Sequence, residues 1–121
     1  MTASAPTLDV VAIGNAIVDV LARSDDAFLA QHALTKGGMQ LIDAEMAETL
    51  YADMPQAKEI SGGSAANTLA GLAALGKKCG FIGQVNDDQL GDVFAHDVHA
   101  LGIRFDTPAM QGDVPTARCL I

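Results

Sequence analysis

The stretch Glu59–Gly76, EISGGSAANTLAGLAALG, decides the fold because two glycines in it join a short strand-like segment to an apolar helix. Residues 57–61 predict a strand. Residues 64–75 predict a helix that ends at Gly76, since glycine commonly follows a helix C-cap. Paired glycines allow the backbone to approach a ligand because no Cβ stands in the way. Asn67 lies one turn inside the helix, although asparagine is a poor helix former, and its amide can both donate and accept hydrogen bonds.

Two interpretations of this stretch remain open from the residues alone. In the first, it is a tight turn between strand and helix, with Ser64 as the N-cap and Asn67 in a local capping bond. In the second, the free N–H groups at the helix N-terminus and the Asn67 amide bind a small hydroxyl-rich molecule. The stretch matches neither the GxxxxGK[ST] phosphate-binding loop nor the G-x-G-x-x-G dinucleotide fingerprint.

A second polar motif lies nearer the N-terminus. Residues 8–13, LDVVAI, predict a buried parallel strand that ends at Gly14. Asn15 and Asp19 then follow in the motif GNAIVD, close to a strand's carboxyl end, where open α/β sheets bind ligands. A carboxylate at position 19 can accept two hydrogen bonds from a sugar diol. Taken alone, this motif is better explained by an Asx turn at Asn15 and a solvated Asp19.

The remaining sequence predicts alternating short strands and helices. Helices are expected at 24–34, at 44–54 after an N-cap at Asp43, and from an N-cap at Asn86 or Asp87 to 101. Strands are expected at 17–24, 39–43, 78–85, 103–110 and 116–121. The order predicts an α/β core sheet together with a small accessory sheet built from the strands that alternate polar and apolar residues.

Composition and charge exclude several classes of protein. The 121 residues suffice for one domain, and the formal net charge of −8 argues against nucleic-acid binding, although it leaves a small anionic ligand open. Cys79 and Cys119 lie far apart, which predicts reduced thiols in a cytoplasmic protein rather than a disulfide or a zinc site. No segment approaches the roughly 20 apolar residues of a membrane span, and the N-terminus does not resemble a signal peptide.

Two histidines and two pairs of charged residues have ordinary explanations. His96 and His99 share one helix face at a spacing that suits a metal, but no third ligand is obvious and Asp92 is the only nearby carboxylate one turn back, so a solvated face is the preferred interpretation. The acidic pair 87–88 and the basic pair 77–78 match the expected charges at the start and the end of a helix.

Three motifs in order resemble the N-terminal part of the ribokinase-like, or PfkB-type, carbohydrate kinases: AIGNAIVD at 12–19, EISGGSAAN at 59–67 and FIGQVNDDQLG at 81–91. KGGMQLID at 36–43 and PTARC at 115–119 are similar to the adenosine-kinase branch and its bacterial sugar-kinase relatives. The resemblance implies a Rossmann-type core sheet with helices on its faces and a small β-sheet lid. The whole chain, 1–121, would then be the N-terminal part of one kinase domain, with core elements at about 8–14 and 64–101 and lid strands at about 15–24, 37–43, 57–61 and 103–121.

The resemblance also implies roles for single residues. Asp19 matches the aspartate that holds two sugar hydroxyls, and Asn15 matches a neighbouring residue of the pocket. Gly62 and Gly63 match the diglycine that lies against the sugar, and Asn67 matches the asparagine that binds one of its hydroxyls. These matches favour the ligand-binding interpretation of the opening stretch.

Two further residues fall on expected lid strands: Leu41 and Cys119 match positions that contact the base or aglycone.

The sequence departs from the family at two places. One is Asn86, where the family often has glycine. Because asparagine tolerates left-handed backbone angles better than most residues, the turn can be kept there. A larger departure is that the family's Gly-Ala-Gly-Asp motif, whose aspartate is the general base, has no match in the sequence. The chain is therefore expected to be the N-terminal portion of a longer enzyme and inactive alone.

The implied activity is ATP-dependent phosphorylation of a sugar or nucleoside hydroxyl, with ATP and Mg²⁺ as cofactors and most of their binding residues elsewhere. The adenosine-kinase form is preferred over a fructokinase or ribokinase form. A different class of function also stays open, namely a ligand-binding or oligomerisation module that keeps the sugar-facing half without catalysis.

Overall fold

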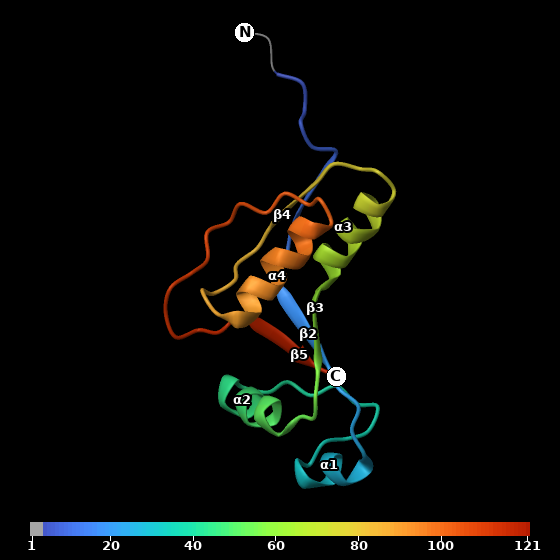
Figure 1. Ribbon diagram of the computed structural model, residues 1–121, viewed down its shortest axis with the longest axis vertical. Coiled ribbons are helices and arrows are strands. Elements are labelled where there is room, and N and C mark those ends of the chain that lie inside the picture. The colour runs from blue at the N-terminus through green and yellow to red at the C-terminus, as the bar shows by residue number, and fades with distance from the viewer. Residues whose placement is uncertain (1–3) are drawn as a thin grey trace.

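A computed structural model describes residues 4–121 (Figure 1). Its elements in chain order are β1 (Val10–Ile13), β2 (Ile17–Leu21), α1 (Asp26–Gln31), α2 (Ala44–Asp53), β3 (Lys58–Gly62), α3 (Ser64–Ala74), β4 (Cys79–Ile82), α4 (Gln89–Ala100) and β5 (Ala117–Leu120). The predicted α/β class is confirmed, and so are a core sheet and a separate accessory sheet.

The strands form two sheets of different character. In the core sheet, β1 and β4 are parallel, with Val10 opposite Cys79, and helix α3 packs against both. The accessory sheet has the order β3-β2-β5, in which β2 is antiparallel to β3 and parallel to β5. Helix α4 packs against β3 and β2, and α2 contacts β5. The central strand β2 thus lies between two edge strands and has helices on one face.

One hydrophobic core joins the two sheets. Phe81 from β4, Phe94 from α4 and Phe105 pack together with ring centroids 5.4 to 5.7 Å apart, in tilted and edge-to-face arrangements. Val18 and Val20 of β2 reach the same cluster and are fully buried. The accessory sheet is therefore held against the core by side chains of its central strand.

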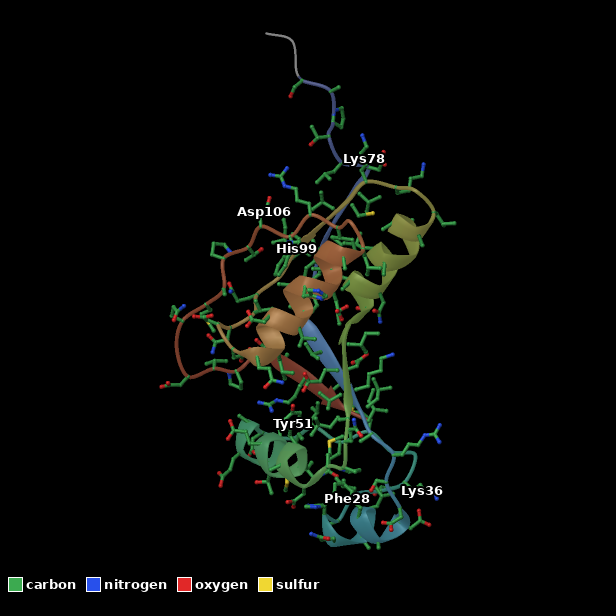
Figure 2. The ribbon with its side chains drawn as sticks, in the orientation of Figure 1. Phe28, Lys36, Tyr51, Lys78, His99 and Asp106 are labelled. Atoms are coloured by element: carbon green, nitrogen blue, oxygen red, sulfur yellow. The ribbon has the colours of Figure 1, made fainter. Side chains whose placement is uncertain are left out.

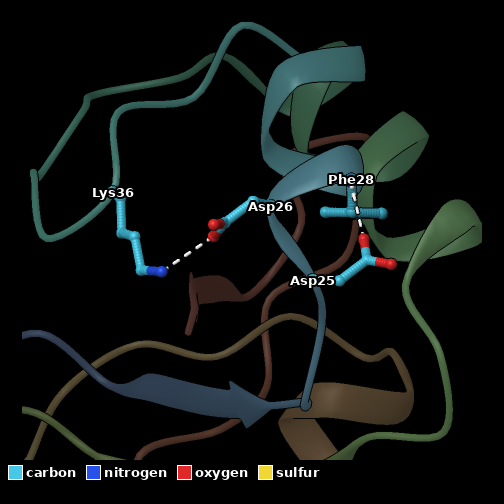
Figure 3. Close-up of polar contacts among 4 residues, drawn as sticks. All are labelled: Asp25, Asp26, Phe28 and Lys36. Carbon is cyan, nitrogen blue, oxygen red and sulfur yellow. Dashed lines mark hydrogen bonds and ion pairs between the residues drawn. The ribbon is translucent and has the colours of Figure 1, made fainter.

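Acidic N-caps begin three of the helices. Asp25 Oδ1 accepts a hydrogen bond from the Phe28 N–H at α1 (Figure 3), and Asp43 and Asp88 cap α2 and α4 in the same way. The cap predicted at Asp43 is confirmed. Those predicted at position 24 and at 86 or 87 are each displaced toward the next suitable aspartate, because several Ser, Asn and Asp residues compete for the same role.

Helix α3 begins differently from its prediction. Ser64 was expected to be its N-cap, but Gly63 has that position with φ of +93°, and no side chain caps the helix. The backbone N–H of Asn67 donates to the carbonyl of Gly63 at 2.9 Å. The capping interpretation of this stretch is therefore wrong, and the polar side chains of the first turn are left for other contacts. The predicted helix stop at Gly76 is confirmed by its φ of +83°.

Two predicted strands are wrong. The segment 37–43, expected to be a lid strand, has no regular structure, and Met39 and Leu41 are among its exposed side chains. A segment forms a strand only where a neighbouring strand can hydrogen-bond to its backbone, and among the described residues no strand pairs with this segment. Residues 103–110 make only isolated bridges, at Arg104 and Met110. The apolar alternation there reflects Ile103 and Phe105, which anchor the segment in the core.

Candidate functional site

Asp19 lies at the centre of the accessory sheet. It pairs with Ile60 of β3 on one side and with Cys119 of β5 on the other. Paired residues in a sheet share a face, and successive residues alternate between faces. Because Val18 and Val20 fill the face that packs on the core, Asp19, Ile60 and Cys119 lie on the opposite one. We call this the open face of the sheet.

The Asp19 carboxylate occupies the space beside Gly62. A Cβ built at Gly62 would lie 2.4 Å from Asp19 Oδ2 and 2.7 Å from Oδ1, which is closer than real atoms approach. Any side chain at position 62 would displace the carboxylate. The first glycine of the pair is therefore required by a side chain on the neighbouring strand, a reason that the sequence motif alone does not disclose.

The second glycine has a different task. Gly63 has φ of +93°, a backbone conformation that L side chains rarely adopt. Its α-carbon faces the Asn15 main chain so closely that a Cβ would lie 3.0 Å from the Asn15 carbonyl oxygen. Gly63 thus turns the chain from β3 into α3 beside the start of β2.

The Asp19 carboxylate is half-buried, and within residues 4–121 it has no hydrogen-bond or ion-pair partner in the structure. Its surroundings on the open face are largely apolar. The exposed fractions are 40% for Ile60, 40% for Leu21 and 60% for Ile121. A lone carboxylate on an apolar surface can accept two hydrogen bonds from a ligand whose carbon skeleton covers the neighbouring side chains.

The structure brings most of the predicted site residues together and leaves one apart. Asp19, Gly62 and Cys119 share one region of the sheet, and Gly63 contacts the main chain of Asn15. Asn67 is exposed in the first turn of α3, which begins directly after Gly63. Leu41 is 89% exposed in the irregular segment 37–43. The strand expected to carry Leu41 does not exist, and the ligand-binding roles of all seven residues stay predictions.

A polar cluster that the sequence did not reveal lies on the covered face. Tyr51 lies at α2 (Figure 2), and its hydroxyl donates to Glu59 Oε1 of β3. Gln89 Nε2 of α4 lies 3.3 Å from Glu59 Oε2, and the Arg118 guanidinium lies 5.7 Å from the centre of the Tyr51 ring. The pKa of Tyr51 is raised, chiefly by the hydrogen bond with Glu59 and to a smaller extent by burial. Polar residues on this face are thus paired with one another.

A second network joins the start of α4 to β5. Thr116, which is 2% exposed, donates its N–H to Asp88 Oδ2 and its hydroxyl to Asp88 Oδ1, at 2.8 and 2.7 Å. The Gly91 N–H donates to the same Oδ1. Burial by itself raises the pKa of Asp88, but the hydrogen bonds from Thr116 and Gly91, with a contribution from Arg118, outweigh it and lower that pKa.

Asn86 belongs to this network in an unexpected way. Its N–H donates to the Thr116 hydroxyl at 2.9 Å, and its side-chain amide donates to the Gly112 carbonyl at 2.8 Å. Among the residues that the structure describes, Ala33 is the only non-glycine residue with a positive φ. Asn86 therefore does not adopt the left-handed backbone that asparagine tolerates, and it is used for its hydrogen bonds.

The two histidines considered as metal ligands have separate partners. His99 Nε2 lies 3.0 Å from the Phe105 carbonyl, whereas His96 Nδ1 lies 3.5 Å from Asp97 Oδ1. Over residues 4–121, no three His, Cys, Asp or Glu side chains come together to hold a metal ion. Cys79 is buried, Cys119 is exposed, and both are free thiols.

A search for membrane spans over the same part of the chain finds no helix of sufficient length and apolarity.

Comparison with known proteins gives the family. The pfkB family carbohydrate kinase profile matches residues 8–121, and the chain belongs to this family. It has 51% sequence identity to the solved adenosine kinase from Sinorhizobium meliloti, with a TM-score of 0.81, over 95% of this chain and 35% of that one. A probable sugar kinase from Rhizobium etli CFN 42 gives 50% identity and a TM-score of 0.81, over 93% and 34% of the two chains.

A curated relative points the same way. The adenosine kinase of Saccharomyces cerevisiae is 27% identical over an alignment 121 positions long, which covers 93% of this chain and 35% of that protein. The chain therefore spans about a third of the length of these relatives, and it corresponds to their N-terminal part. The ribokinase-like fold expected from the three motifs is confirmed.

Proposed function

We propose that the chain forms the acceptor-binding part of a cytoplasmic kinase that transfers a phosphoryl group from ATP to a hydroxyl of a nucleoside or sugar. The observation that carries this proposal is the Asp19 carboxylate, which lies against Gly62 on the open face and has no partner among residues 4–121. Two neighbouring hydroxyls of the acceptor would donate to the two oxygens of Asp19. The absence of a Cβ at Gly62 and Gly63 would allow the acceptor to lie against the backbone.

Asn67 would add a further contact. Its side chain projects from the first turn of α3, where no side chain caps the helix. An amide there both donates to and accepts from a hydroxyl, and the unpaired N–H groups of the turn supply positive potential. Asp19 would fix the acceptor through charge-assisted hydrogen bonds, while Asn67 would help to orient it. Phosphoryl transfer depends chiefly on such positioning of the two reactants.

The residues of this chain do not fit ATP and Mg²⁺. The described residues 4–121 hold no cluster of metal ligands, and the sequence has no phosphate-binding loop of the GxxxxGK[ST] type. We therefore propose that the groups that bind the nucleotide, the metal and the reacting proton belong to the part of the full-length protein that matches the remainder of the relatives. Exposed Val11, Ile13 and Ile82 on the core sheet support further packing there. The 121 residues alone would be inactive.

The apolar surroundings of Asp19 favour a nucleoside over a free sugar. Ile60, Leu21 and Cys119 offer little to the many hydroxyls of a hexose, whereas a planar base can cover them. Adenosine is the first acceptor to test, because two relatives are adenosine kinases. A free sugar is the second candidate, because the chain is similar to a probable sugar kinase to nearly the same degree.

The test is Asp19→Ala in the full-length protein. We expect kcat/KM for the best acceptor to fall by about 30- to 1,000-fold, on the order of 2–4 kcal/mol, because a charge-assisted hydrogen bond to the acceptor is lost. Asp26→Ala is the matched control, since Asp26 pairs only with Lys36 at the surface (Figure 3). Unchanged kinetics of Asp19→Ala with adenosine, ribose and fructose would remove Asp19 from the site.

A further inference from the structure

Helix α4 reaches both edge strands of the accessory sheet through two carboxylates that the proposed function does not use. Asp97 Oδ2 accepts a hydrogen bond from the Ser61 N–H of β3 at 2.8 Å. Asp88 accepts two hydrogen bonds from Thr116, the residue directly before β5. The two edge strands are the ones that place Gly62 and Cys119 on either side of Asp19.

The hydrogen bond between Asp97 and β3 lies next to the glycine that contacts the Asp19 carboxylate. An edge strand has outward N–H groups without a strand partner, and Asp97 satisfies the one on Ser61. Ser61 directly precedes Gly62, whose α-carbon limits the position of the Asp19 carboxylate. A shift of β3 by a few tenths of an ångström would therefore change the space available to that carboxylate. Gln89 of α4, which lies 3.3 Å from Glu59 Oε2, adds a second contact to the same strand.

The contact to β5 is more deeply buried. Thr116 is 2% exposed, and its hydroxyl both donates to Asp88 and accepts from the Asn86 N–H. Residue 117 begins β5, so the network sets where that strand enters the sheet. Two residues further on, Cys119 stands opposite Asp19. Asp88 is also the N-cap of α4, so one carboxylate holds both the helix and the strand.

We propose that Asp88 and Asp97 are positioning residues, through which α4 holds the two edge strands of the accessory sheet and thereby sets the geometry of the acceptor site around Asp19. This inference rests on the proposed function and goes beyond it, because neither residue contacts the open face. The hydrogen bonds are charge-assisted and reach backbone N–H groups, so they constrain the main chain rather than one rotamer. Their effect is on the affinity for the acceptor, not on that for ATP.

The first experiment compares Asp97→Ala with Asp97→Asn in the full-length protein. The alanine variant loses the acceptor for the Ser61 N–H, and we expect KM for the acceptor substrate to rise about tenfold with little change in KM for ATP. The asparagine variant keeps a carbonyl oxygen at the same place, and we expect it to recover most of the loss. Asp92→Ala is the matched control, because Asp92 is an exposed acid on the same helix.

The second experiment treats the β5 side with Thr116→Ser and Thr116→Val. Serine keeps the hydroxyl that bridges Asp88 and the Asn86 N–H, whereas valine has nearly the same volume and lacks it. We expect a raised KM for the acceptor with valine and a KM close to that of the wild type with serine. Amide hydrogen exchange gives an independent measurement that needs no substrate. The Ser61 amide is expected to exchange faster in Asp97→Ala, and the amides of residues 117–119 faster in Thr116→Val.

The outcomes separate the two proposals. An active wild-type protein in which Asp97→Ala and Thr116→Val leave the acceptor KM unchanged overturns the inference, while the proposed function stands. A wild-type protein that phosphorylates none of adenosine, ribose and fructose overturns the proposed function. In that case unaltered exchange at residues 61 and 117–119 in the variants overturns the positioning role as well. Equal rises in KM for acceptor and for ATP also contradict it, because they indicate a general loss of structure.

Discussion

The two faces of the accessory sheet differ although they belong to the same strands. On the covered face, Val18 and Val20 are fully buried, and Glu59 and Arg118 are engaged with Tyr51. On the open face, Asp19 stands unpaired, within the described residues, among exposed apolar side chains. Because side chains alternate along a strand, every second residue of β2 packs in the core and the others lie on the open face, where we propose that the acceptor binds. We therefore expect substitutions on the covered face to change stability and substitutions on the open face to change acceptor binding.

The largest expected effect is a loss of stability on substitution of a buried residue of the covered face. Val18→Asn would place a side-chain amide without partners at a position that is 0% exposed, and we expect the free energy of unfolding to fall by about 3–5 kcal/mol. Ile60→Asn on the open face is the matched control, with an expected loss of about 1 kcal/mol or less. Urea unfolding of the full-length protein measures both. Equal losses would show that the two faces are not functionally distinct.

An intermediate effect is expected at the glycine beside Asp19. The Cβ of Gly62→Ala would overlap the Asp19 carboxylate, and we expect kcat/KM for the acceptor to fall by about 100-fold through misplacement of that carboxylate. Gly71→Ala in α3 is the control, because its Cβ would meet open space. That substitution should stabilise the helix by about 0.5–1 kcal/mol without altering the kinetics. A Gly62→Ala protein with wild-type kinetics would contradict the geometry around Asp19.

The smallest expected effect is a change in the pH dependence of stability, caused by Asp88 in its hydrogen-bond network with Thr116. The folded-state pKa of Asp88 is lowered, so its ionised form stabilises the fold above the unfolded-state pKa, which is about 4. This contribution is lost as the pH falls from that value through the folded-state pKa. We therefore expect Asp88→Asn to lose less stability than the wild type between about pH 5 and pH 2, as followed by urea unfolding at each pH. Parallel stability profiles of the two proteins would exclude this role for Asp88.

Much of the local structure around the candidate site was predictable because it depends on short-range sequence. The diglycine between a strand and a helix, with a polar residue one turn later, lies within the nine positions 59–67, and glycine has few other uses there. The end of α3 before Gly76 and the N-cap of α2 at Asp43 were predicted for the same reason. The strand predicted at 37–43 is wrong and the hydrogen bonds of Asn86 were not predicted, because both depend on partners distant in the sequence. Within the described residues, the first found no strand to pair with, and the second found Thr116 and Gly112.

The sequence by itself determined the α/β class, the order of most elements and the motifs that indicate a carbohydrate kinase, because these follow from local backbone preferences and from the spacing of apolar residues. Only the tertiary structure decided that Asp19 and Cys119 share a face, that the Asp19 carboxylate forbids a side chain at Gly62, and that Asp88 and Asp97 of one helix hold both edge strands. Those relations join residues 28 to 100 positions apart. They arise from strand register and from directional hydrogen bonds, which exist only once the sheet and α4 have packed together.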